Sequence, residues 1–404
     1  MRLLHTSDWH LGKKLESFSR LKEQKAVMQE ICDIADKKQV DAIVVAGDIF
    51  DTFNPPVEAI ELFYKTVRKL SNNGLTPVIV IAGNHDSPDR IEAPDPLARE
   101  LGIIFLGYPN SVKTKFELES GLSLSQTAEG FIEFTLPNKE LLRIITTPYA
   151  NEQRLKSFLG IEDKDQKLRD ILQQKWQQTA DKYCDNKGVN ILLTHLFVTK
   201  KGQPQQSEPD DEKPILHIGG AQAIYSSAIP KQIQYTALGH LHKNQLIDPD
   251  RAPIVYCGTP IAYSFSETNQ KKCLVIVDIK AGEQANYEFI ELLKGKKLLQ
   301  QKFTSINDCL LWLEQNQNTL VEITLEMASY LTADEKKSLY DAHSGIVNII
   351  PRVNKKSEQT DDNSNNINLN DNITDLFKQY FASRHGNQQP NDELIDLLKE
   401  MIAS

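Results

Sequence analysis

Cysteine is scarce in this chain, and its few cysteines are not spaced for metal binding or cross-linking. The 404 residues include five cysteines, an odd number without any Cys-x-x-Cys pair: Cys32, Cys184, Cys257, Cys273 and Cys309. This pattern excludes a disulfide-stapled framework and a zinc site held by cysteines. It is typical of proteins in a reducing compartment, and we expect a cytoplasmic location.

Long apolar runs are also missing. No run approaches the roughly 18 residues that a membrane-spanning helix needs. The chain starts at Met1 and runs directly into an apolar stretch, without the basic and apolar leader of a secreted protein. We therefore expect no membrane partner.

The chain has no excess of positive charge. Its 46 Lys and Arg residues against 55 Asp and Glu residues give a formal net charge of −9. A protein that holds duplex nucleic acid mainly by a basic surface does not usually have this balance. If the substrate is a nucleic acid, contact must come from a local patch, from bound metal or from a partner chain. The short lysine runs at 13–14, 200–201 and 294–297 are candidates, although such runs are more often plain solvated surface.

Two common catalytic motifs are absent from the sequence. There is no Gly-x-x-x-x-Gly-Lys-Ser/Thr loop for ATP and no Gly-x-Ser-x-Gly elbow for a nucleophilic serine. We therefore expect neither ATP hydrolysis by this chain alone nor a covalent serine mechanism.

The apolar pattern predicts a layered α/β domain. With 404 residues, 40% of them hydrophobic, the chain can bury a large core and form two or three domains. Short apolar runs alternate with amphipathic stretches near residues 20–38 and 56–71, which predicts strands joined by helices that cover the outer faces of a sheet. The predicted strands are 3–6, 42–45, 78–81, 103–106, 131–134, 143–146, 189–193, 235–238 and 254–256.

The C-terminal third reads as separate units. A strand at 273–277, a helix near 307–317 and a strand at 321–325 predict a small α+β domain over residues 271–350, after a first domain at 1–270. Residues 351–372 are rich in Asn, Asp, Ser and Lys and predict a disordered linker. Residues 373–404 contain two short amphipathic helices, each marginal in isolation, so their apolar faces need a partner.

Five predicted strands end in polar tips that carry metal-ligand side chains. They are Asp8-Trp9-His10, Gly47-Asp48, Gly83-Asn84-His85-Asp86, Thr194-His195 and Gly239-His240-Leu241-His242. A lone histidine after a strand is more often packed or exposed without a function, but that does not explain five such tips. Mixed oxygen and nitrogen ligands suit Mn²⁺, Fe²⁺ or Zn²⁺ better than Mg²⁺ or Ca²⁺. Asp48 has two carboxylate oxygens and could bridge two cations.

In this order, the tips resemble the calcineurin-like metallophosphoesterase superfamily over residues 1 to about 260. The resemblance implies two divalent ions, usually Mn²⁺. One ion would be held by Asp8, His10, Asp48 and His242, and the other by Asp48, Asn84, His195 and His240. It implies that His85 stands over the scissile phosphate and stabilises or protonates the leaving oxygen. Asp51 would orient His85, although a helix N-cap is an alternative, and Asp86 would brace the turn.

Within this superfamily, the segments 4–12, 237–242, 258–260 and 264–267 resemble the nuclease subunits of bacterial SbcCD double-strand-break processing complexes. That resemblance implies an exonuclease and endonuclease acting on double-stranded DNA ends and hairpins. It also implies a capping domain after residue 270, an SbcC-type ATPase gripped by the C-terminal helices, and a homodimer within a heterotetramer. The alternatives are a stand-alone dimetal phosphodiesterase or phosphatase and an inactive metal-stabilised scaffold.

Overall fold

The structure, a computed structural model, describes residues 1–155, 164–202, 223–327, 331–353, 373–384, 390, 394–395 and 398. The chain divides into two compact units, 1–352 and 353–404. The expected linker lies outside the described residues from position 354 onward, as does most of the second C-terminal helix. Among the described residues, no helix combines the length and apolar character required to cross a membrane.

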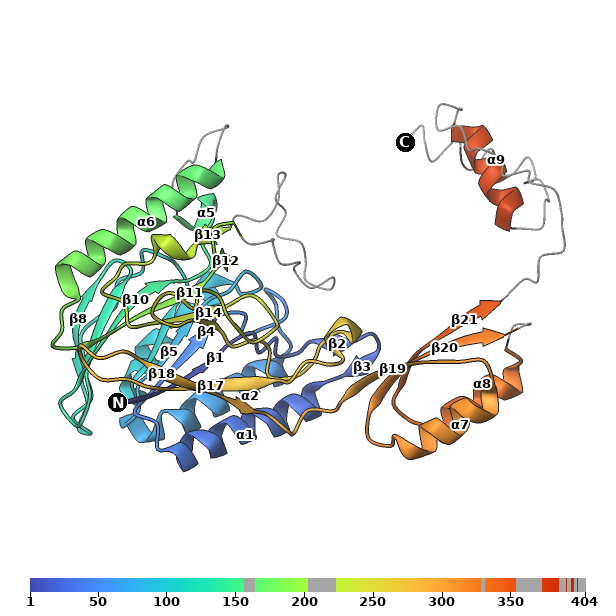
Figure 1. Cartoon of the computed structure of the whole chain (residues 1–404), viewed down its shortest axis with the longest axis horizontal. Coiled ribbons are helices and arrows are strands. Elements are labelled where there is room, and N and C mark those ends of the chain that lie inside the picture. Colours follow the sequence, from blue (N-terminus) through green and yellow to red (C-terminus); the bar gives the residue numbers. More distant parts are fainter. Residues whose placement is uncertain are drawn as a thin grey trace. The chain divides into compact units, whose positions relative to one another are not determined.

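Two mixed β-sheets form the centre of the first unit (Figure 1). The first sheet contains, in spatial order, β18 (Asn286–Glu291), β17 (Cys273–Asp278), β1 (Arg2–Thr6), β4 (Ala42–Ala46), β5 (Val78–Ile81) and β6 (Ile103–Leu106). Its four strands from β1 to β6 are parallel, and β17 and β18 are antiparallel additions. All residues of β4 and β5 are buried, as expected for parallel strands that are covered on both faces.

The second sheet has a parallel centre and an antiparallel edge. Its strands are, in order, β15 (Gln245–Leu246), β16 (Ile254–Tyr256), β14 (Tyr235–Gly239), β11 (Val189–His195), β10 (Leu141–Thr147), β9 (Phe131–Thr135), β8 (Ser123–Ala128) and β7 (Phe116–Glu117). Strands β16, β14, β11 and β10 run parallel, and β9, β8 and β7 continue antiparallel. This arrangement confirms the prediction of a mixed α/β fold.

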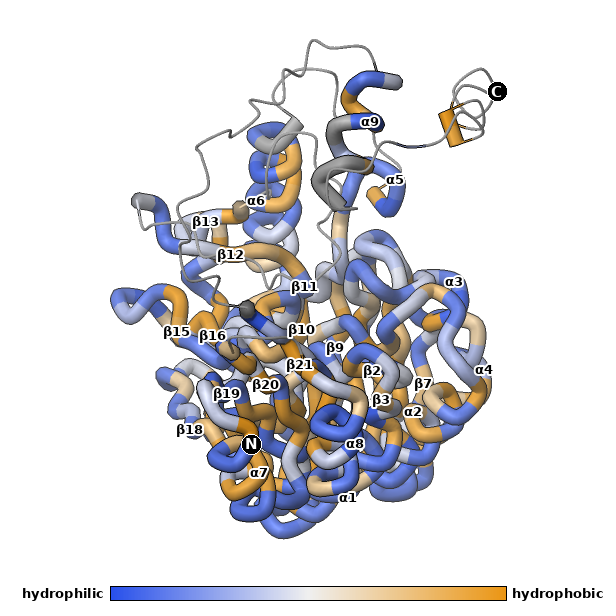
Figure 2. The backbone as a smooth tube through the Cα atoms, turned by 90° about the vertical axis from the view of Figure 1, so that its right-hand side faces the viewer, coloured by the Kyte–Doolittle hydropathy of each residue, from blue (hydrophilic) through white to orange (hydrophobic). Residues whose placement is uncertain are grey.

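Helices cover the outer faces of both sheets. Figure 1 shows α1 (Leu21–Lys38) and α2 (Val57–Leu70) on one side of the sheets and α6 (Lys164–Tyr183) on the other. The buried side chains of α6 recur every four residues, at Leu168, Leu172, Trp176 and Ala180, and they join the core of the second sheet. Figure 2 accordingly shows both hydrophobic and hydrophilic stretches along the tube of α6.

The other elements that accompany the two large sheets are short. They are the hairpin β2 (Lys14–Leu15) and β3 (Phe18–Ser19), the pair β12 (Val198–Thr199) and β13 (Ile224–Tyr225), the helices α3 (Pro88–Glu92), α4 (Asp95–Ala98) and α5 (Glu152–Leu155), and the 3₁₀ turns η1 (Asn72–Gly74), η2 (Arg99–Leu101), η3 (Ser226–Ala228) and η4 (Phe265–Glu267). Helix α5 directly follows the loop after β10, and this places it beside the turn after β5.

One expectation about domain boundaries is wrong. We expected the strand at 273–277 to begin the small C-terminal domain, but it is β17, which pairs antiparallel with β1 and brings β18 with it. The physical reason is that β1 would otherwise be a buried edge with unpaired N–H and C=O groups. The first sheet therefore includes residues up to Glu291, and the small three-stranded sheet begins at β19.

The small unit is a three-stranded sheet covered by two helices. It contains β19 (Leu298–Phe303), α7 (Ile306–Gln315), β20 (Leu320–Met327), α8 (Ala333–Ala342) and β21 (Ile346–Val353). It has its own apolar core, which includes Cys309, Leu313, Ile323 and Leu339. The second compact unit contains α9 (Ile373–Arg384), in which Tyr380 is exposed.

Candidate metal centre

The predicted ligand tips converge where the two sheets meet. Asp8, Asp48 and Asn84 follow β1, β4 and β5 of the first sheet, while His195 and His240 lie at the ends of β11 and β14 of the second. The sheets touch so closely at this point that a Cβ on Gly239 would lie 1.8 Å from the carbonyl oxygen of Ala46. Only glycine allows this approach.

We expect Gly239→Ala to destabilise the fold and to move the predicted ligands apart. A Cβ at 1.8 Å from a backbone oxygen forces the two strands apart, and this oxygen also accepts a hydrogen bond from His195 Nδ1 at 2.7 Å. The free energy of unfolding should fall by on the order of 2 kcal/mol or more, and Tm should therefore fall by at least several degrees. Gly188→Ala is the control, because Gly188 has no positive φ and a Cβ there would meet only side-chain atoms of Arg143 and Leu141, at 3.2 Å. A Gly239→Ala protein with wild-type Tm would contradict the close approach.

Two histidines and Asp48 form the first half of the cluster. His10 Nε2 lies 3.1 Å from His242 Nε2 and 3.8 Å from Asp48 Oδ2, and all three side chains are buried. Asp8 stands next to them, where its Oδ1 accepts a hydrogen bond from the backbone N–H of His240 at 2.9 Å and its Oδ2 accepts one from Ser7 at 2.5 Å. This half contains the residues that were predicted for one ion.

The second half lies on the other side of Asp48. His195 Nε2 is 2.9 Å from Asn84 Oδ1 and 3.3 Å from Asp48 Oδ2, and His240 Nδ1 is 3.3 Å from the same Asn84 oxygen. Asp48 Oδ2 is buried and accepts no hydrogen bond from the described residues, although it faces histidines of both halves. A buried carboxylate oxygen in this position fits a bridge between two cations.

The backbone is strained at the predicted ligands. Four of them have positive φ angles: Asp8 at 52°, His10 at 41°, Asp48 at 49° and His240 at 109°. Such conformations cost non-glycine residues about 1–3 kcal/mol each, and they persist at sites where geometry matters for function. Strain at four neighbouring ligands indicates a functional centre and not ordinary turns.

The charges of the cluster also fit a divalent cation. Burial, with the nearby charge of Asp48, raises the pKa of Asp8 to about 6 against the opposing effect of His195. Burial lowers the pKa of His10 well below its ordinary value, so its imidazole is neutral, as metal ligation requires. Two buried carboxylates in one site are costly without a compensating cation. The donor set and its electrostatics therefore fit divalent metal ions.

In two histidines, a hydrogen bond at Nδ1 fixes the tautomer of the neutral ring. His195 Nδ1–H donates to the carbonyl of Ala46 at 2.7 Å, and His242 Nδ1–H donates to Glu267 Oε1 at 3.2 Å. In the neutral ring, both contacts place the proton on Nδ1, so that Nε2 is the nitrogen available to bind a metal.

Glu267 and Lys272 were missed as site residues. Lys272 is buried and donates to Glu267 Oε2, to Thr259 at 2.8 Å and to the carbonyl of His242 at 3.1 Å. Burial opposes ionisation of Glu267, but the hydrogen bond from His242 and the charge of Lys272 lower its pKa to about 2. The segment 264–267 was recognised only as part of a resemblance, and no spacing in it indicates a bond to His242.

We expect Glu267→Gln to weaken metal binding about 10–100-fold, because the uncharged amide is a poorer acceptor for His242 and leaves Lys272 without its counter-charge. Titration calorimetry with Mn²⁺ measures the effect. Glu291→Gln is the matched control, since Glu291 pairs with Lys271 at 3.0 Å on the surface. Equal Mn²⁺ affinity in both variants would rule out a role for Glu267 in holding His242.

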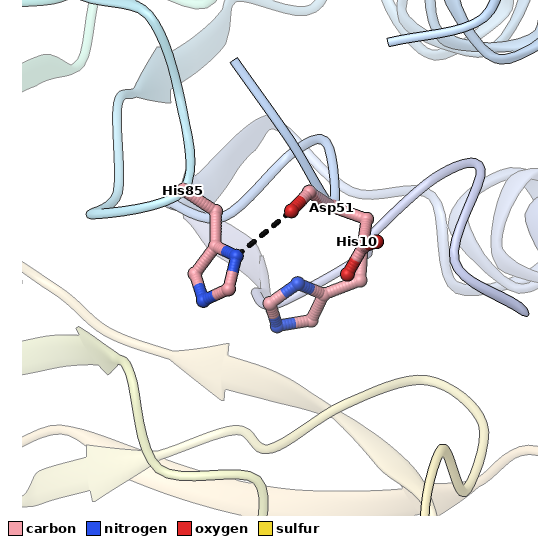
Figure 3. A group of neighbouring side chains, drawn as sticks. All are labelled: His10, Asp51 and His85. Carbon is pink, nitrogen blue, oxygen red and sulfur yellow. Dashed lines mark hydrogen bonds between the residues drawn. The ribbon is translucent and has the colours of Figure 1, made fainter. Parts of the chain in front are cut away.

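His85 lies next to His10, with ring centroids 4.9 Å apart. Its Nδ1 contacts the backbone carbonyl of Asp51 at 2.9 Å, shown as the dashed line in Figure 3, and its Nε2 forms no hydrogen bond within the described residues. Asp51 therefore contacts His85 through its main-chain oxygen. Its carboxylate lies 3.8 Å from Lys13 Nζ and also within 4.8 Å of ring nitrogens of His10 and His85. The N-cap residue of α2 is Pro56, so the N-cap alternative is wrong.

Asp86 braces the turn, as expected. Its carboxylate accepts hydrogen bonds from the backbone N–H groups of Ile49 and Phe50 at 3.0 Å and of Gly83 at 2.8 Å. The turn after β5 is thereby tied to the loop that carries Asp48, whose Oδ1 accepts from the N–H of His85 at 2.9 Å. These bonds fix the two loops relative to each other.

Comparison with known proteins agrees with this geometry. Residues 1–244 match the family described as calcineurin-like phosphoesterase. The chain is 36% identical to the SbcD component of the nuclease SbcCD from Bacillus subtilis (strain 168), with 100% of this chain and 98% of that protein covered. It is 28% identical to the protein of the same name in Staphylococcus epidermidis, over 100% of this chain and 99% of that protein. For the Escherichia coli K12 protein the identity is 32%, over 71% of this chain and 67% of that protein. The chain therefore belongs to the calcineurin-like phosphoesterases and, within them, to the SbcD family.

Proposed function

We propose that this chain is a metal-dependent DNA nuclease that hydrolyses phosphodiester bonds as exonuclease and endonuclease. The observation that carries the proposal is the arrangement around Asp48. One of its carboxylate oxygens is buried, accepts no hydrogen bond from the described residues, and lies between two groups of imidazole and amide donors, beside His85. Membership in the SbcD family supports DNA as the substrate.

Each of two ions would be held by one half of the cluster, with Asp48 shared. The first half provides Asp8, His10 and His242, and the second provides Asn84, His195 and His240. Mixed nitrogen and oxygen donors suit Mn²⁺, Fe²⁺ or Zn²⁺, and from these we propose Mn²⁺, which is the cation that the family resemblance implies. When bound, two such cations polarise a phosphodiester and lower the pKa of water at the site.

Side chains and backbone groups of this chain would position the substrate and donate the proton to the leaving oxygen. The carbonyl of Asp51 accepts the Nδ1–H of His85, which leaves Nε2 for the substrate. A protonated Nε2 can stabilise the leaving oxygen or donate a proton to it. Asp48 and Asp86 hold the backbone of the turn that carries His85, so that its ring stays in place.

We also propose that the chain works as one subunit of a cytoplasmic complex with an SbcC-type ATPase. The sequence has no ATP-binding loop of its own. Helix α9 carries apolar residues, with Tyr380 exposed, and the terminal segment is the proposed docking site for the ATPase. A homodimer through helices of the first domain such as α2, where Val57 is exposed, would place two sites on one DNA. The substrates would be double-stranded DNA ends and hairpins, and residues 298–353 would act as the capping domain.

The test is cleavage of end-labelled blunt duplex and hairpin DNA by the purified chain with Mn²⁺, with and without the ATPase partner and ATP. Cleavage that requires Mn²⁺, and becomes ATP-dependent with the partner, supports the proposal. Hydrolysis of bis-(p-nitrophenyl) phosphate with DNA left intact under every condition would instead indicate a stand-alone phosphodiesterase. Mn²⁺ binding without either activity would indicate a metal-stabilised scaffold.

A further inference from the structure

We propose that Arg154, in α5, is a positioning residue that holds Asn84 and His85 in place for the reaction. Its guanidinium donates from Nη1 to the carbonyl of Gly83 at 2.7 Å and from Nη2 to the carbonyl of Asp86 at 2.8 Å. Asn84 and His85 are the two residues between these carbonyls. The inference rests on the proposed function, since it assigns Arg154 to the same site.

The single guanidinium group of Arg154 thus bonds both ends of the turn. The five N–H donors of arginine have a fixed fork geometry, so two bonds from one guanidinium set the distance between the two carbonyls. Hydrogen bonds from a charged donor are roughly twice as strong as neutral ones. The turn cannot shift without breaking at least one of them.

Arg154 is itself held on several sides. Its side chain is buried, its guanidinium lies 5.0 Å from the centre of the Tyr149 ring, and its backbone N–H donates to Asn151 Oδ1 at 2.9 Å. The backbone N–H of Tyr149 donates to the carbonyl of Ala82 at 2.9 Å, directly before the turn. The segment 149–154 is therefore fixed to the end of β5 at both of its ends.

The opposite side of the same turn is held by the carboxylate of Asp86. That carboxylate connects the turn to the loop after β4 through the N–H groups of Ile49, Phe50 and Gly83. Asp86 thus sets the turn relative to Asp48, and Arg154 sets it relative to the second sheet through β10. Asn84 and His85 take their places from both.

The chain provides a matched control, which is a second arginine that links two backbone carbonyls of a loop outside the predicted site. Arg251 donates to the carbonyls of Ser226 at 2.9 Å and Ile229 at 2.6 Å, with the same three-residue spacing as Gly83 and Asp86. None of the proposed ligands lies between those two carbonyls. Arg251→Met therefore removes the same kind of staple without touching the site.

The test compares Arg154→Met, Arg154→Lys and Arg251→Met in the full-length chain. It measures Tm, Mn²⁺ binding by calorimetry, hydrogen exchange of the peptide that contains 83–86, and kcat and KM for duplex DNA. For Arg154→Met we expect kcat to fall about 100-fold, since small misplacements of catalytic groups have effects of this size, with KM within about threefold. We expect the affinity for one Mn²⁺ ion to fall about tenfold, because Asn84 would be displaced from its position as a ligand. Hydrogen exchange at 83–86 should become faster.

The other two variants separate positioning from general stability. Arg154→Lys should recover part of kcat, because an ammonium group keeps the charge but does not match the fork that spans both carbonyls. Arg251→Met should lower Tm yet leave kcat, Mn²⁺ binding and exchange at 83–86 unchanged. Wild-type kcat and Mn²⁺ affinity in Arg154→Met, or equal losses in Arg251→Met, would overturn the proposal.

Failure of the proposed function gives a different pattern. If the wild-type chain binds Mn²⁺ but leaves DNA intact, the nuclease proposal fails, and the role of Arg154 is then judged by calorimetry and hydrogen exchange alone. If Arg154→Met does not fold, Arg154→Lys decides: wild-type kcat and Mn²⁺ affinity in this variant overturn the proposal, and a partial loss of both supports it.

Discussion

His85→Ala is expected to lose DNA cleavage while the protein still binds both metal ions. His85 provides no ligand in the proposed metal shell, and its Nδ1 is engaged by the Asp51 carbonyl at 2.9 Å, so only Nε2 serves the reaction. Losing a group that donates a proton to the leaving oxygen costs about 10²–10⁴-fold in rate. Single-turnover cleavage with Mn²⁺ measures this loss, and calorimetry measures the retained binding.

The matched control is His343→Ala. His343 is also buried, but it lies after α8 in the small unit, where its Nε2 contacts the carbonyl of Asn316 at 3.1 Å. That variant should cleave DNA at the wild-type rate. If His85→Ala cleaved equally well, the role of His85 would be wrong. If it lost Mn²⁺ instead, His85 would have to be assigned as a ligand.

Asp48→Ala should abolish binding of both ions, because each half of the cluster faces its Oδ2. The stabilisation that bound metal gives the folded state would vanish, so Mn²⁺ should no longer raise Tm. We also expect a lower Tm without metal. Asp48 Oδ1 accepts the N–H of His85, and Asp48 is the main reason that the pKa of His195 is raised to about 9 despite burial. Removing such a partner from a buried group costs about 1–3 kcal/mol.

Differential scanning fluorimetry with and without Mn²⁺ tests this expectation. Asp248→Ala is the comparison, because Asp248 is a buried carboxylate that bonds Ser226 at 2.7 Å and lies outside the cluster. It should lower Tm and keep the full Mn²⁺-induced rise. If Asp48→Ala retained the affinity of one ion, a bridging role for Asp48 would be excluded.

The secondary structure could be predicted where the local pattern is strong. The apolar runs at 78–81 and 103–106 are β5 and β6 without change, and the run at 42–45 lies within one residue of β4. These strands are buried on both faces, so every residue in them is apolar and the run marks the strand. The same reasoning located the ligand tips, because side chains that follow parallel strands gather at one edge.

The pairing of strands could not be predicted in the same way. β17 has the apolar run of any buried strand, and nothing local shows that its partner is β1, more than 260 residues earlier in the chain. From the sequence, we assigned it to the small C-terminal domain. Hydrogen bonding to an otherwise unpaired edge decided its place.

The sequence alone identified five strand-end tips with metal-ligand side chains, and the family resemblance selected the predicted ligands from them, namely Asp8, His10, Asp48, Asn84, His195, His240 and His242. Tertiary structure alone decided what supports it. The backbone carbonyl of Asp51 bonds His85, Glu267 bonds His242, and Arg154 bonds both ends of the turn after β5. These contacts join segments far apart in the chain, and they depend on backbone position, which residue identity does not encode locally.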